Sequence, residues 1–146
     1  MAADAGLYGL TLEKMMIDTL GVSLEAETNQ LALVTDSYTP DFNADEDFAD
    51  VDNEVSGTGY TSGGVAVTST EITVSNGVLT FDAADTVFSS VTIANARAGI
   101  LTAWSGTAAT SELILSSDFG SDFSATAANF TVQWHASGIF TVDYIP

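Results

Sequence analysis

The stretch that decides the fold is "VAVTSTEITVSNGVLTFD", residues 65–82. Apolar and β-branched side chains alternate with polar ones on both sides of Asn76-Gly77. Both residues of this pair accept the positive φ of a type I′ turn, so the pair predicts a β-hairpin. The returning segment "VLTFD" is expected to place Leu79 and Phe81 on one face. Antiparallel β-structure is therefore expected at the centre of the chain.

Threonine, serine, valine and isoleucine dominate the second half of the sequence, and β-branched residues suit a pleated surface. Further strands are expected at 86–104, 112–120, 130–134 and 139–145. The run "SDFSATAAN", residues 121–129, is expected to be a polar loop, and the last two strands a closing hairpin around "HASG". Short strands at such spacing predict an antiparallel β-sandwich or barrel.

The N-terminal residues 7–20, "LYGLTLEKMMIDTL", have the spacing of an amphipathic helix. Thr11 is expected to cap its start and Gly21 to end it. We therefore predict a mainly β fold, an antiparallel β-sandwich or barrel with one N-terminal α-helix. A chain of 146 residues fits a single β domain, residues 1–146, with a helical arm over 1–28 and the sandwich or barrel over 29–146.

The formal net charge is -18, from 20 acidic and 2 basic residues. Such a surface repels polyanions, so nucleic acid and anionic membrane are not expected as partners. Basic proteins, cations and apolar surfaces are suitable partners. The N-terminus "MAADAGLYGL" lacks the basic and apolar regions of a secretory signal, and no apolar run has the length of a membrane span. Synthesis in a cytoplasm is expected.

The densest cluster of acids precedes a glycine-rich turn in residues 37–64, "SYTPDFNADEDFADVDNEVSGTGYTSGG". Acidic and amide side chains alternate there as at the start of a calcium loop: Asp41, Asn43, Asp45 and Asp47. The helix-loop-helix calcium pattern also requires Gly and Glu where this chain has Glu46 and Asp52. Three interpretations stay open: a calcium site of another geometry, a solvated loop, and a docking surface for basic residues of a neighbouring protein.

Apolar residues of the helix and of the acid-to-glycine segment are the candidates for contact with a partner. They are Leu7, Leu10, Met15, Met16, Phe42, Phe48 and Tyr60. Phe42, Phe48 and Tyr60 are also expected to anchor the acidic segment. Five aromatic residues, Tyr60 again among them, suit either a core or a sugar-stacking platform: Trp104, Trp134, Tyr60, Tyr144 and Phe140.

No catalytic constellation emerges from the sequence. His135 is the only histidine and there is no cysteine, so His-based nucleophile activation and thiolate metal sites lack members. The abundance of acids makes any chosen carboxylate pair uninformative. Arg97 lies within an expected strand, and we expect a salt bridge to a nearby carboxylate. An enzyme is not expected, and calcium is the only cofactor considered.

Four blocks of the sequence resemble small structural virion proteins of tailed bacteriophages. They are "ALVTDSYTPDFNADEDFADVDNEVSGTGYTSGG" (32–64), "VLTFDAADTVFSS" (78–90), "GTAATSELILSSDFGSD" (106–122) and "FTVQWHASGIFTV" (130–142). The resemblance implies a structural component of the phage particle without enzymatic activity, found in the virion after synthesis in the host cytoplasm.

Within that family, the leading hypothesis is a capsid decoration (cement) protein that stabilises the head. Its partners would be the major capsid protein or neighbouring virion proteins, and it would be a homo-oligomer, with a trimer favoured. One alternative is a tail or head-fibre component, such as an adhesin. The alternative from another class is a calcium-binding module.

Overall fold

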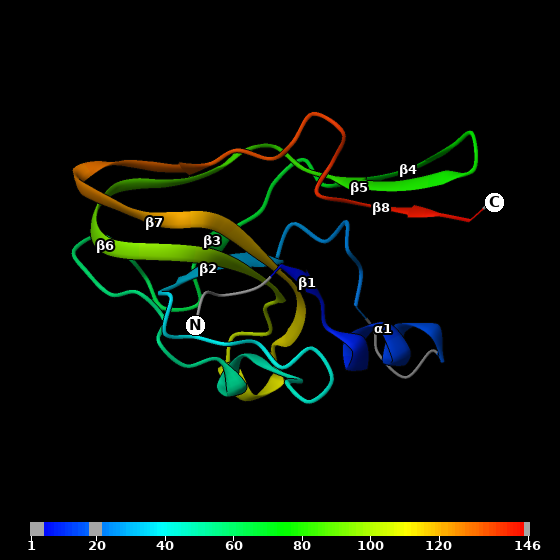
Figure 1. Ribbon diagram of the computed structural model, residues 1–146, viewed down its shortest axis with the longest axis horizontal. Coiled ribbons are helices and arrows are strands. Elements are labelled where there is room, and N and C mark those ends of the chain that lie inside the picture. The colour runs from blue at the N-terminus through cyan, green and yellow to red at the C-terminus, as the bar shows by residue number, and fades with distance from the viewer. Residues whose placement is uncertain (1–4, 18–21, 145–146) are drawn as a thin grey trace.

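The computed structural model describes residues 5–17 and 22–144 (Figure 1). Strands account for 48% of the residues and helices for 10%, which confirms the mainly β prediction. All strand pairs are antiparallel, and the one α-helix of the described residues lies near the N-terminus. The two sheets have a sandwich-like arrangement.

The larger sheet has five strands and the smaller sheet three. In spatial order, the larger sheet contains β1 (Gly6–Leu7), β7 (Glu112–Val132), β6 (Thr86–Ala103), β2 (Gln30–Val34) and β3 (Val65–Ala66). The smaller contains β4 (Glu71–Ser75), β5 (Val78–Asp82) and β8 (Phe140–Asp143). The helices are α1 (Gly9–Met16) and two short 3-10 helices, η1 (Phe48–Asp50) and η2 (Ala108–Thr110).

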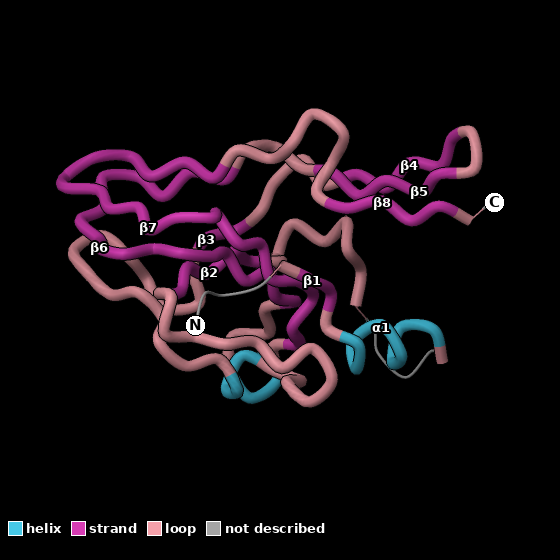
Figure 2. The backbone as a smooth tube through the Cα atoms, in the orientation of Figure 1, coloured by secondary structure: helices cyan, strands magenta, loops and turns pink. Residues whose placement is uncertain are grey.

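The predicted hairpin is confirmed. Ser75 pairs with Val78, and Asn76 and Gly77 between them have φ values of 52° and 84°. Phe81 in the returning strand is completely buried. The hairpin extends away from the larger sheet, at the end opposite to the bend of the β6–β7 ribbon (Figure 2).

Strands β6 and β7 form one long curled ribbon, and the first of two wrong local predictions concerns β7. Residues 121–129, expected to be a polar loop, lie inside β7 and pair with β6. Small polar residues are tolerated there because the paired strand supplies the backbone hydrogen bonds. Positive φ values at Ser90 and Asn95 coincide with shifts in the β6–β7 register, and such bulges bend a ribbon.

The closing hairpin is the second wrong prediction. β8 pairs with β5 rather than with residues 130–134, and Val78 lies opposite Asp143. The β4–β5 hairpin already offers a free, twisted edge, so β8 completes that sheet. Residues 130–132 instead finish β7, where Val132 pairs with Thr86.

Each face of the larger sheet is covered by its own apolar core. Along β2, Leu31 and Leu33 face one core, while Ala32 and Val34 face the other. The first core also contains Phe81 of the smaller sheet. The second core is closed by Tyr38 and Phe48 from the acid-rich segment. That segment is therefore a structural layer, which explains why "LALV", residues 31–34, is a continuous apolar run.

The N-terminal region differs from its prediction in detail. Leu7 belongs to β1 and pairs with Leu115, so the expected helical arm begins with a strand of the larger sheet. The helix begins at Gly9, and Thr11 lies inside it, where its buried hydroxyl donates to the carbonyl of Leu113. The expected end at Gly21 lies outside the described residues. No helix in the described part of the chain has the length and apolarity to cross a membrane.

Candidate functional site

The acidic segment is held in shape by its own carboxylates. Asp47 caps η1, because its side chain accepts a hydrogen bond from the amide of Ala49 at 2.9 Å. Asp50 reaches back to accept from the amides of Glu46 and Asp47, at 2.9 and 3.3 Å. This reciprocal arrangement is a capping box, which satisfies amides that a helix start leaves unpaired.

The first half of the segment uses the same device. Asp41 accepts from the amide of Asn43 at 3.0 Å. Asp45 accepts from the amide of Asp41 and from the hydroxyl of Tyr38, both at 2.9 Å. The Tyr38 hydroxyl lies 2.8 Å from that of Tyr8. Burial raises the pKa of both phenols above the ordinary value, so both hydroxyls stay protonated at neutral pH.

These contacts account for the alternating acids without a metal. The predicted calcium ligands Asp41, Asp45 and Asp47 each accept a hydrogen bond from a backbone amide. Asn43 donates its backbone amide to Asp41. Within residues 5–17 and 22–144, no three carboxylate or imidazole groups come together in an arrangement that could hold a metal ion. The structure thus does not gather these four residues into a ligand set.

The glycine-rich turn is organised by Glu54. Its carboxylate accepts from the Tyr60 hydroxyl at 2.8 Å, the Ser62 hydroxyl at 2.6 Å and the Gly63 amide at 2.7 Å. The Tyr60 oxygen also accepts from the amide of Leu33 in β2, at 2.9 Å. Burial, followed by the charge of Glu54, raises the pKa of Tyr60. Tyr60 therefore anchors the turn to the sheet.

Helix α1 lies against the acidic segment. The amide of Gly9 donates to the carbonyl of Phe42 at 2.8 Å, and the rings of Tyr8 and Phe42 are 5.2 Å apart. Lys14 joins Glu46 of the segment to α1 and lies 3.2 Å from Glu112. The hydrogen bond to Glu46 raises the pKa of Lys14. Helix and segment thus form one continuous surface.

We call this surface the acidic face. It consists of α1 with Ile17 and the exposed acids of residues 41–52, namely Asp41, Glu46, Asp50 and Asp52. Among the candidate contact residues, Met16 is 83% exposed. Leu12 and Ile17 are exposed as well and were not predicted. Helix α1 ends at Met16, and the side chains of Met16 and Ile17 are both exposed to solvent.

The other candidate contact residues serve the fold. Phe48 is buried, and its ring meets that of Trp104 edge-on at 5.7 Å. Leu7, Leu10, Met15, Phe42 and Tyr60 are each partly buried. Phe42, Phe48 and Tyr60 act as anchors, as the sequence indicates. The five aromatic residues considered for a sugar platform are dispersed: Trp104 packs on the second core, whereas Tyr60, Trp134 and Phe140 pack on the first.

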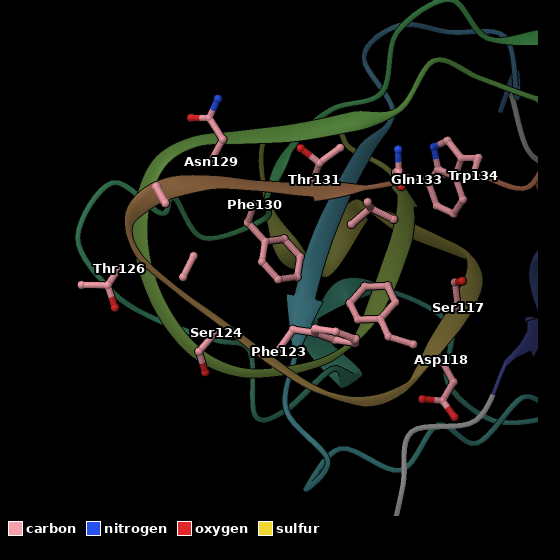
Figure 3. Close-up of a pocket in the computed structure, with 14 residues that line it drawn as sticks. Ser117, Asp118, Phe123, Ser124, Thr126, Asn129, Phe130, Thr131, Gln133 and Trp134 are labelled. Atoms are coloured by element: carbon pink, nitrogen blue, oxygen red, sulfur yellow. The ribbon is translucent and has the colours of Figure 1, made fainter.

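Apart from the acidic face, a concave region lies inside the curl of β7. It encloses about 680 Å³ and is lined almost entirely by residues of that one strand (Figure 3). Phe123 and Phe130 point into it, Phe119 packs against both rings, and Trp134 stands at its edge. No signal in the sequence indicated this pocket, because residues 121–129 of its lining strand were expected to be a loop.

The expected salt bridge of Arg97 is confirmed beside this pocket. Its Nε lies 2.7 Å from Asp118, and a second nitrogen lies 3.8 Å from Asp122. The guanidinium, with help from the amide of Gly120, lowers the pKa of Asp118. Arg97 of β6 thus forms ion pairs with two acids of β7, and these pairs help to hold the two strands together.

Comparisons with protein-family models, with curated protein sequences and with solved structures each find no match.

Proposed function

We propose that this chain is a phage virion structural protein, and specifically a capsid decoration protein that stabilises the head. The observation that supports the proposal most is the acidic face. Its carboxylates stand on an ordered layer, and the exposed side chains of Met16 and Ile17 lie at its helical end. It offers a partner both charge and apolar area.

Order matters to the proposed role because a surface that is already fixed loses little conformational entropy on docking. The capping box of Asp47 and Asp50, and the contacts of Asp45, fix the backbone that carries the acids. A basic patch on a shell protein would be the complementary partner. Such contacts are individually modest, but they add up when one oligomer binds several neighbouring shell subunits.

Copy number in purified virions is the first test. Quantitative mass spectrometry should find the chain at hundreds of copies per particle. A few to some dozens of copies would indicate the tail or fibre alternative instead. Absence from the particle would overturn both proposals.

Binding to undecorated shells is the second test. Met16→Asp and Asp52→Lys should each weaken co-sedimentation of the full chain with shells by about tenfold or more, as expected for central contact residues. Val74→Asp is the matched control, because Val74 is 61% exposed on the smaller sheet, away from the acidic face. Equal binding by all the variants would contradict the proposed surface.

The calcium alternative is tested on the same protein. If calcium is bound, a chelator should lower the melting temperature and added calcium should restore it, since a ligand of the folded state stabilises that state. An unchanged melting temperature in both conditions would discard the calcium-binding module.

A further inference from the structure

Charge is distributed very unevenly along this chain. Sixteen of the 20 acidic residues lie in residues 1–85, and the remaining four are Glu112, Asp118, Asp122 and Asp143. Residues 123–142 contain no Asp, Glu, Lys or Arg. This uncharged run includes the second half of β7, in a protein whose net charge is -18.

The same segment exposes apolar groups. We call the concave side of β7 with the adjoining Trp134 the ribbon face, lined by Phe119, Phe123, Ala128, Phe130 and Trp134. Phe123 is 47% exposed although its ring meets that of Phe119 at 6.4 Å. A folded chain gains by burying such a side chain, and here nothing within the described residues covers it.

The backbone of this segment is also incompletely paired. β1 pairs with β7 only at Leu115 and Ser116, and β6 occupies the other edge. The outer edge of β7 beyond Ser116 therefore has no strand partner among the described residues. Charged side chains commonly protect such edges, yet residues 123–132 carry none.

We propose that the ribbon face is the docking site for a second copy of this chain. A basic partner would gain nothing from an uncharged face, because the acids that attract it lie elsewhere. Two copies at net charge -18 repel each other wherever their acidic faces meet. At the ribbon face two such chains can approach closely with little repulsion, because the two acids beside it, Asp118 and Asp122, are both paired with Arg97. This contact is independent of the proposed function, because it needs no phage partner.

Salt separates the two kinds of contact. Raising the ionic strength from about 0.05 M to about 1 M shortens the Debye length to roughly 3 Å and screens the mutual repulsion of the copies. Self-association through the ribbon face should therefore strengthen. Binding of a basic partner to the acidic face should weaken under the same change. Opposite responses would show that two surfaces are at work.

The test measures the mass of the full chain in solution by sedimentation velocity and light scattering over a concentration series. The wild type should form an oligomer, and Phe123→Asp should weaken association by at least about tenfold, as for a central interface residue. Ala128→Glu is the second variant: it places a charge on the same face at an exposed small residue, without removing a ring. Circular dichroism and melting temperature establish that both variants fold.

Ile17→Asp is the matched control, because Ile17 is 60% exposed and lies on the acidic face. It should leave the oligomer intact. A monomeric wild type at high salt, or folded Phe123→Asp and Ala128→Glu variants that associate as the wild type does, would overturn the inference. Loss of the oligomer in Ile17→Asp alone would overturn it too, and would move self-association to the acidic face. None of these results decides whether the chain is found in virions.

Discussion

The acidic face and the ribbon face use the larger sheet in opposite ways. On the acidic face, aromatic residues such as Tyr38 and Phe48 point inward, and the carboxylates point to backbone amides or to water. On the ribbon face, Phe123 points outward and charge is absent from residues 123–142. A high net charge therefore does not mean that charged residues are spread evenly over the surface. Here it separates one face suited to basic partners from another suited to a like-charged copy.

The largest expected difference in stability is between alanine substitutions at two glycines with positive φ. Gly64→Ala, under the acidic segment, should lower the free energy of unfolding by about 4 kcal/mol or more, because a Cβ there would lie 1.8 Å from the carbonyl oxygen of Leu31. Gly106→Ala, in the β6–β7 connection, meets nothing within 4 Å and should cost about 1 kcal/mol from φ alone. Urea denaturation measures both, and equal losses would refute the close-approach argument.

Matched removal of one ring from each face comes next. Phe48→Ala should destabilise the chain by about 3 kcal/mol or more, because it empties a buried site beneath the acidic segment. Phe123→Ala in the dissociated chain should cost about 1 kcal/mol or less, since half of this ring is already in water. Thermal and urea unfolding at low protein concentration give both values. A larger loss for Phe123 would mean that the ribbon face is core rather than contact surface.

The next comparison removes one tyrosine hydroxyl at a time, from Tyr60 and from Tyr144. Tyr60→Phe leaves the amide of Leu33 without its acceptor and removes the tyrosine hydrogen bond of the Glu54 carboxylate, which keeps those from Ser62 and Gly63, so a loss of about 1–3 kcal/mol is expected. Tyr144→Phe, at an exposed position of the C-terminal region, should change stability by less than about 0.5 kcal/mol. If the two variants unfold at the same urea concentration, Tyr60 is not the anchor of the glycine-rich turn.

The smallest expected effect concerns the ion pair of the ribbon. The pKa of Asp118 is lowered in the folded chain, so its contribution to stability is present above the ordinary value near 3.8 and is lost as the pH falls through the folded value. Asp118→Asn should therefore be less stable than the wild type at pH 7 and equal to it in strong acid. Arg97→Gln should reduce the same pH dependence to the part that the Gly120 amide supplies, and an undiminished pH dependence in that variant would point to another cause.

Local signals predicted the parts of the fold that depend on local chemistry. Asn76-Gly77 set the turn and register of the β4–β5 hairpin within its own few residues. Residues 121–129 form strand only because β6 pairs with them from a distant part of the chain. The same holds for β8, whose partner β5 could not be chosen from its own sequence. Pairing between distant segments depends on the tertiary structure, and it can override the local preference of a segment for loop or strand.

The candidate site follows the same division. The alternating acids were visible in the sequence, and the spacing of Asp47 and Asp50 is that of a capping box. What the spacing could not reveal was the tyrosine beneath them, Tyr38, or the contact of Lys14 with both Glu46 and Glu112. The pocket in β7 had no sequence signal beyond a lack of charge, because its shape comes from the curl of a paired ribbon.

The two basic side chains have one more consequence. Trypsin-like proteases cut after Lys or Arg, and this chain offers them only Lys14 and Arg97. Lys14 is ion-paired within α1, and Arg97 is ion-paired in the middle of β6. Cleavage at either peptide bond requires the surrounding element to open locally. The rates at which fragments 1–14 and 98–146 appear, resolved by mass, would therefore report the opening of the helix and of the ribbon separately in a single digestion.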